Sequence, residues 1–130
     1  MDKLIIIIEK GTGQYAAYAE NCPGIYGAGD TVEEAKDNCL EGLRLFIETS
    51  KNIPGILKGE YEIIYRFDIQ SFLKYYEKIF QKTALSKITG VNPKLLHHYA
   101  SGLKKPRMEQ RKRIEKALHM LGKELSSVEL

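Results

Sequence analysis

The chain has 130 residues, of which 43% are hydrophobic and 28% are charged, a composition typical of a globular protein with one substantial core or two small ones. This composition excludes disordered, collagen-like and coiled-coil chains. The aliphatic run from Leu4 to Ile8 is far shorter than the ~18 residues that a membrane span needs. Two cysteines without metal-ligand spacing, Cys22 and Cys39, agree with a reducing compartment. We therefore expect a soluble, cytoplasmic protein.

The net charge of +3 conceals an asymmetry between the two halves of the chain. Residues 1–66 carry 7 basic and 11 acidic side chains, a net −4, whereas residues 67–130 carry 13 and 6, a net +7. Such asymmetry is typical of an acidic module joined to a basic one that meets a polyanion. We predict two domains, residues 1–69 and residues 70–130, and an α+β fold class for the whole chain.

Residues 1–69 are predicted to form a small domain of order β-β-β-α-β. Strand-like segments at 4–9, 15–20 and 25–28 are separated by turns and indicate an antiparallel meander, the first strand being covered on both faces. Residues 52–59 are expected to be a loop, and 61–69 a fourth strand. After the third of these strands, Thr31 to Glu34 fits a capping box at the start of a helix. Its apolar stripe, which we expect to pack on the sheet, is Val32, Ala35, Cys39, Leu43, Phe46 and Ile47.

Residues 70–130 are predicted to be all-helical. Apolar periodicity indicates helices at 71–80, 83–89, 93–100 and 109–121. Gly90 can end a helix in a left-handed conformation, Asn92 is a good N-cap, and Pro93 suits the first helical position. Residues 83–100 therefore fit a helix-turn-helix, the motif that presents the start of its second helix to base edges in the major groove of DNA.

The outward side chains of that second helix are candidate DNA contacts. We expect Asn92, Lys94 and His98 to read bases. Since helix-turn-helix proteins commonly bind paired half-sites, we also expect a homodimer or a higher even-numbered oligomer. Contacts to the phosphate backbone, which set register without reading sequence, are expected from His97, Lys104, Lys105 and Arg107.

Two segments resemble known families. Residues 82–107, with Gly90 and Lys105-Pro106, resemble the lambda-repressor/Cro-like helix-turn-helix class. Residues 18–35, with Cys22-Pro23-Gly24 and Gly29-Asp30-Thr31, resemble the core signature of HicB-type antitoxins of toxin-antitoxin systems. The resemblance spans nearly the whole chain. It implies a partial ribonuclease-H-like first domain that binds and neutralises a HicA-type mRNA-cleaving toxin, and a second domain that binds operator DNA and represses its own operon.

The acidic charge of the first domain agrees with this implied partner, because opposite potentials speed encounter and favour pairing with a basic RNA-cleaving protein. The sequence leaves one other function open, a stand-alone helix-turn-helix transcriptional regulator whose first domain senses a ligand or dimerises. A neighbouring gene for a small basic protein would favour the antitoxin.

A nuclease is the enzymatic alternative, because a ribonuclease-H-like sheet can carry metal-binding carboxylates. Two-metal chemistry needs several carboxylates that converge on ions ~4 Å apart. The first strand offers only Glu9, near its end. We therefore expect no enzyme activity, no catalytic or metal-binding residues, no cofactor and no membrane association. The other acids have the spacing of a solvated helix face: Glu33, Glu34, Asp37 and Glu41.

Overall fold

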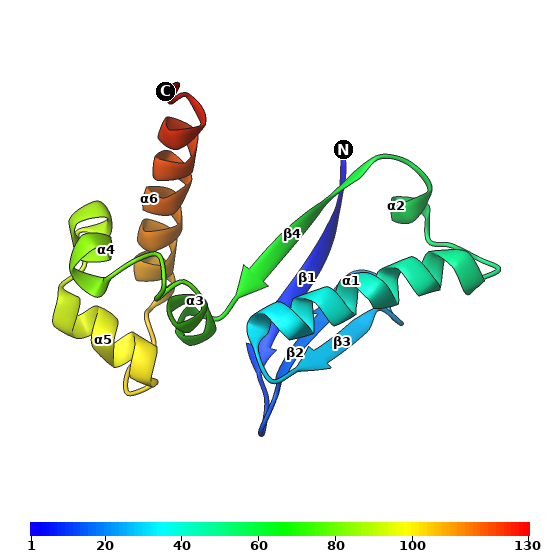
Figure 1. Ribbon diagram of the computed structural model, residues 1–130, viewed down its shortest axis with the longest axis horizontal. Coiled ribbons are helices and arrows are strands. Elements are labelled where there is room, and N and C mark those ends of the chain that lie inside the picture. The colour runs from blue at the N-terminus through cyan, green and yellow to red at the C-terminus, as the bar shows by residue number, and fades with distance from the viewer. The chain divides into compact units, whose positions relative to one another are not determined.

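The computed structural model describes all residues 1–130 and has an α+β fold with a four-stranded mixed sheet and six helices (Figure 1). The chain divides into two compact units, Met1–Ser71, which holds the sheet, and Phe72–Leu130, which is helical. The sequence placed this division after residue 69. With the observed division, the first unit carries 7 basic and 12 acidic side chains, a net −5, and the second carries 13 and 5, a net +8. No helix combines the length and the apolar character that crossing a membrane requires.

The sheet of the first unit has the strand order β3-β2-β1-β4. Strand β1 (Asp2–Lys10) pairs antiparallel with β2 (Tyr15–Ala19), which pairs antiparallel with β3 (Tyr26–Gly29), so the predicted meander is confirmed. Strand β4 (Tyr61–Phe67) pairs parallel with β1. A parallel neighbour requires a crossover connection, and the segment containing helix α1 (Val32–Thr49) supplies it.

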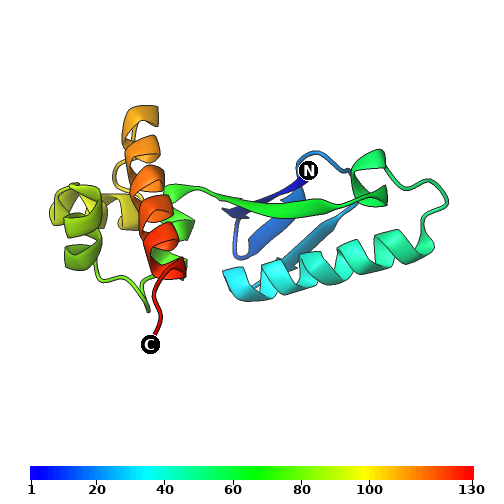
Figure 2. The same ribbon diagram turned by 90° about the horizontal axis from the view of Figure 1, so that it is seen from above.

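Helix α1 lies along one face of the sheet (Figure 2). Leu4, Ile6 and Ile8 of β1 are buried, whereas Ile5 and Ile7, which point to the opposite face, are only half-buried. The prediction that this strand is covered on both faces is therefore wrong. Strand β1 is apolar throughout because it lies between β2 and β4, and side chains of these neighbouring strands partly shield each of its faces.

The backbones of α1 and β3 approach each other closely, and glycines make this approach possible. A Cβ atom on Gly27 would lie 2.6 Å from the carbonyl carbon of Asn38 and 2.8 Å from the oxygen of Ala35. On the helix side, a Cβ on Gly42 would lie 2.8 Å from the carbonyl oxygen of Tyr26. These glycines are thus required by packing, since neither has a positive φ.

The start of α1 follows the predicted capping pattern with one difference. The Thr31 hydroxyl accepts a hydrogen bond from the Glu34 amide at 3.1 Å, as expected. The Glu34 carboxylate reaches back to the amide of Asp30 at 3.0 Å rather than to that of Thr31. Along the helix, the predicted stripe is buried at Val32, Ala35, Cys39 and Leu43 and half-buried at Phe46 and Ile47.

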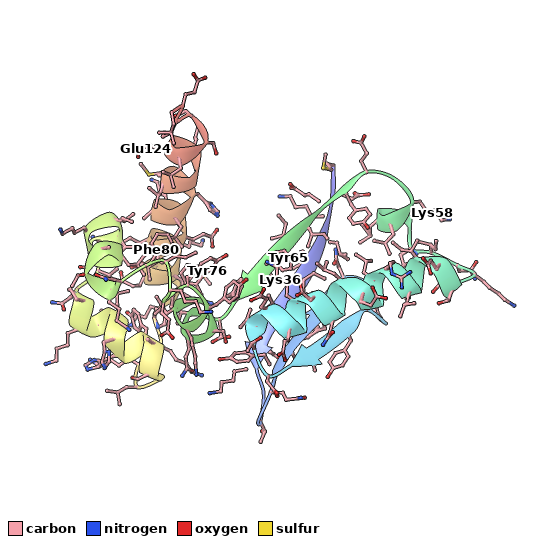
Figure 3. All side chains as sticks on the ribbon, viewed as in Figure 1. Lys36, Lys58, Tyr65, Tyr76, Phe80 and Glu124 are labelled. Carbon is pink, nitrogen blue, oxygen red and sulfur yellow. The ribbon has the colours of Figure 1, made fainter.

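Other side chains around this core account for the remaining features of the first unit. Cys22 and Cys39 are both buried, and burial raises the pKa of each thiol. Lys36 of α1 places its ammonium group 4.1 Å from the centre of the Tyr65 ring (Figure 3). The predicted loop 52–59 contains one helical turn, α2 (Gly55–Lys58), which buries Leu57. The loop prediction is therefore wrong for this turn, which is too short to give a periodic signal.

The second unit contains α4 (Lys82–Thr89), α5 (Pro93–Ser101) and α6 (Met108–Ser126), and α3 (Ile69–Tyr75) runs into it from the first. Helix α3 is shorter than the predicted helix 71–80. The chain after Tyr75 turns, and the rings of Phe72, Tyr76 and Phe80 form an aromatic cluster (Figure 3). Helix α6 runs five residues past the predicted end at 121, continuing through Gly122. The buried apolar residues of the second unit are Leu73, Leu85, Val91, Leu96, Tyr99 and Ile114.

Candidate nucleic-acid interface

Helices α4 and α5 are joined by a tight turn whose conformation is fixed by its own residues. Gly90 has a φ of 75° and ends α4 in the left-handed region, as predicted, with its amide donating to the oxygen of Ser86 at 2.8 Å. Thr89 is buried, and its hydroxyl donates to the Leu85 oxygen and accepts from the Val91 amide. Val91 is itself buried and anchors the turn to the core.

The structural role of Thr89 in this turn was not predicted from the sequence. Its hydroxyl satisfies both a helix-end carbonyl and a turn amide, at 2.8 and 3.2 Å. The available signal was a threonine directly before the glycine that ends the helix, a place where a hydroxyl commonly bonds the carbonyl four residues earlier.

Helix α5 carries three of the side chains that are predicted to meet DNA, Lys94, His97 and His98. Leu96 and Tyr99 are buried and face the rest of the unit. At about 100° per residue, Lys94 lies opposite them, and His97 and His98 fall on either side of it. Lys94 and His97 are exposed, whereas His98 is half-buried. The structure therefore presents Lys94 at the centre of an outward face, with the two histidines at its margins.

Asn92 has a structural role that limits how it can contact a base. Its side-chain oxygen accepts the amide of Lys94 at 2.8 Å and so caps α5. An asparagine that reads adenine in the major groove uses its oxygen as acceptor and its amide nitrogen as donor. The oxygen already accepts one hydrogen bond at the helix start, whereas the amide nitrogen of Asn92 has no partner in the structure, so the nitrogen is the group best placed to contact a base.

A run of exposed basic side chains connects α5 to α6. Lys104, Lys105 and Arg107 are all exposed, as their predicted contact with phosphates requires. The ion pairs of the structure all lie in residues 1–71, so no basic side chain of the second unit is held in an ion pair. The net charge of this unit is +8.

Arg113 of α6 brings one further positive charge to the turn between α4 and α5. A Cβ atom on Gly90 would lie 2.5 Å from a terminal nitrogen of Arg113, so the guanidinium rests over this glycine. This contact with a turn more than twenty residues earlier in the chain depends on the packing of α6 against α4.

The first unit offers a different kind of surface on the face of the sheet opposite α1. Ile5 is paired with Ile64, and Ile7 with Tyr18, so these side chains lie side by side. Tyr26 on the neighbouring strand is 61% exposed. We call this the uncovered sheet face, formed by Ile5, Ile7, Ala16, Tyr18, Tyr26, Ala28 and Ile64. An apolar surface of this kind marks an interaction site when charged residues surround it.

Charged residues lie beside the uncovered sheet face, and others lie along α1 on the opposite side of the sheet. Arg66 and Glu20 form an ion pair at 2.9 Å. On α1, Arg44 binds Glu41 and Glu48, and its hydrogen bonds hold the pKa of Glu41 below the usual value. The acids predicted to face solvent, Glu33, Glu34, Asp37 and Glu41, are all exposed.

The acidic residues do not converge. No group of three or more His, Cys, Asp or Glu side chains lies close enough together to hold a metal ion.

Comparisons of the chain with models of protein families, with curated proteins and with solved structures found no match.

Proposed function

We propose that the protein is a HicB-type antitoxin, which binds and neutralises a HicA-type mRNA-cleaving toxin and represses its own operon by binding operator DNA. In this proposal α4 and α5 form a helix-turn-helix, and the sheet unit is a partial ribonuclease-H-like domain. The observation that carries the proposal is the exposed, N-capped start of α5, with Lys94 at its centre, on a unit of charge +8 without internal ion pairs.

The DNA-binding part follows from the geometry of α5. A recognition helix meets base edges with the residues of its first turn, so Lys94 is the principal base contact, with Asn92 donating from its amide nitrogen and His98 reaching from the margin. Phosphate contacts set the position of the helix in the groove. These are assigned to His97, Lys104, Lys105 and Arg107, all exposed.

The toxin-binding part is supported by the charge and surface of the first unit. A basic ribonuclease is attracted by a unit with a net charge of −5. The uncovered sheet face has the apolar centre and charged margin of a protein interface. The stand-alone regulator remains the second candidate, because the same face also suits a second copy of this chain.

Operator binding is tested with fluorescence anisotropy on the promoter DNA of the protein's own operon, compared with a scrambled fragment. We expect Lys94→Ala to weaken binding to the promoter about tenfold, since a base contact contributes ~1–3 kcal/mol. Lys58→Ala is the matched control, because Lys58 is exposed on α2 of the first unit. Equal affinities of the Lys94 variant and the wild type would contradict the assignment of α5.

Toxin binding is tested by pull-down with the small basic protein encoded beside this gene. We expect Tyr26→Lys to reduce capture, because it places a positive charge on the uncovered sheet face. Ile79→Lys, at a 70% exposed position of the second unit, should not reduce it. If the wild-type chain fails to capture its neighbour, the antitoxin assignment is wrong and the stand-alone regulator is favoured.

A further inference from the structure

Strand β4 lies at one border of the sheet and has a neighbouring strand on one side only. It pairs with β1, and no other strand pairs with it (Figure 1). An edge strand presents backbone N–H and C=O groups that can pair with another chain. The border formed by β4 is therefore a place where a further strand can join the sheet.

Strand β4 lacks the features by which proteins usually protect such an edge. It contains no proline and no glycine, and its seven residues pair one to one with β1 without a bulge. The opposite edge, β3, is different, because it has four residues, two of which are glycines that α1 approaches closely. Of the two edges, β4 is thus the one suited to pairing.

The side chains of β4 are mostly apolar but poorly covered. None of its seven residues is fully buried, whereas β1, β2 and β3 each contribute at least two buried residues. Helix α1 packs chiefly on β3 and β2, so β4 lies at the margin of the layer that it forms. A strand added beside β4 would cover its aliphatic and aromatic residues further, which are Tyr61, Ile63, Ile64, Tyr65 and Phe67.

The sequence of β4 is complementary to itself in the antiparallel direction. With Ile64 opposite Ile64 of a second copy, Glu62 lies opposite Arg66. Both charged residues are exposed, and they share one face of the sheet because they are four positions apart. On the other face, Ile63 lies opposite Tyr65, and the two terminal residues, both aromatic, lie opposite each other. Pairs of these kinds stabilise antiparallel sheets.

We propose that two copies of the chain pair through β4, antiparallel and centred on Ile64, and so join their sheets into one. The two-fold axis is perpendicular to the sheet, so both α1 helices lie on one side and both uncovered sheet faces on the other. The seam holds two Glu62–Arg66 pairs. Arg66 can form its pair while it keeps its bond to Glu20, because that bond uses one terminal nitrogen of a group with five N–H donors.

The order of charges along β4 favours a second copy over a basic protein. The net −5 of the first unit attracts a basic protein and repels a second copy, and Glu60 and Asp68 beside the strand add to this repulsion. The repulsion is screened beyond about 8 Å at physiological salt, whereas the paired charges of the seam are in contact. A basic strand would be attracted by Glu62 and repelled by Arg66, but a second copy places an opposite charge at both positions. We therefore expect a weak dimer.

Cross-linking through introduced cysteines tests this contact in the full chain. The reagent is a bifunctional thiol reagent that spans about 5 Å, the distance between opposite Cβ atoms in an antiparallel pair. At about 0.1 mM protein, a concentration suited to a weak contact, Ile64→Cys should give a cross-linked dimer, because residue 64 faces its own equivalent. The wild type gives the background, since Cys22 and Cys39 are both buried.

Glu62→Cys and Arg66→Cys are the matched controls. Both positions are exposed, and in the proposed register each lies about 14 Å from its own equivalent, four residues along a strand. Neither variant alone should therefore cross-link. A mixture of the two variants should, because position 62 of one copy lies opposite position 66 of the other.

The charge pairs are tested in the Ile64→Cys chain. Arg66→Glu should lower the yield of cross-linked dimer at least about threefold, because Glu62 then faces a glutamate at both ends of the seam. Glu62→Arg added to Arg66→Glu should restore the yield, since each charge again faces its opposite. Lys51→Glu makes the same change in net charge at an exposed position outside β4 and should leave the yield unaltered. Circular dichroism checks that each variant keeps its fold.

Three results would overturn the proposal: no cross-link above background in Ile64→Cys, equal cross-linking of Ile64→Cys and Glu62→Cys, or a mixture of Glu62→Cys and Arg66→Cys that gives no more dimer than either variant alone. The samples contain neither DNA nor the neighbouring protein. The β4 contact and the proposed function therefore succeed or fail separately.

Discussion

Gly27 lies where the backbone of α1 meets β3, and no larger residue fits there. We predict that Gly27→Ala lowers the free energy of unfolding by about 1–3 kcal/mol or more, because the clash is with backbone atoms of Asn38 and Ala35 that cannot rotate away. Urea denaturation of the full chain measures this change. Gly55→Ala is the control, since a Cβ at Gly55 meets nothing within 4 Å. Equal losses in the two variants would show that the close approach is not what requires Gly27.

Single residues differed in how well the sequence predicted them. Thr31, Gly90 and Asn92 were predicted correctly as cap residues, because a cap bonds to an amide or carbonyl a few positions away and so leaves a local pattern. The packing role of Gly27 and the contact of Arg113 with Gly90 were not predicted. Both depend on residues that are distant in sequence and come together only when the helices dock.

At the scale of elements, Asn92, which caps the start of α5, is also a proposed DNA contact. We predict that Asn92→Ala lowers the free energy of unfolding of the chain by about 1 kcal/mol, because the Lys94 amide loses its acceptor. Asn92→Ser should keep most of this stability, since a serine oxygen also caps a helix, yet it should bind the promoter more weakly because the amide donor is lost. Thermal denaturation and anisotropy measure the two effects.

Asn52→Ala provides the control for these substitutions, because Asn52 is exposed in the connection before α2 and caps no helix. Should Asn92→Ser destabilise the chain as much as Asn92→Ala, the side-chain oxygen would not be what stabilises the start of α5. If Asn92→Ser binds the promoter as the wild type does, the amide nitrogen does not read a base.

Element boundaries were predicted well where local chemistry sets them and less well where packing does. Helices α4 and α5 were predicted to within one residue at each end, because glycine, asparagine and proline mark their limits. Strand β1 was wrongly expected to have two covered faces, since a continuous apolar run does not show whether its second face meets a helix or remains open. Phe80 lies outside α3, where its ring packs with that of Tyr76 across a turn.

At the scale of the molecule, the chain separates two opposite charges into two compact units. Sequence composition predicted this separation because charge is counted without knowledge of the fold. It did not predict the uncovered sheet face, because this face is defined by the absence of a helix packed on it. The proposed toxin and the proposed operator would thus bind to different units, the toxin at the uncovered sheet face and the operator at the exposed side of α5.

This separation leads to a prediction about salt. Lys104→Ala combined with Lys105→Ala should weaken promoter binding and reduce the slope of log affinity against log salt by about 2, because each lost phosphate contact releases about one fewer counterion. Neutralisation of the toxin should be unchanged, since the first unit contains neither lysine. Lys51→Ala with Lys58→Ala is the control, because it removes the same charge from exposed positions of the first unit and should leave the slope unaltered. An equal fall in slope for both pairs would mean that net charge, rather than contact at the segment between α5 and α6, governs DNA binding.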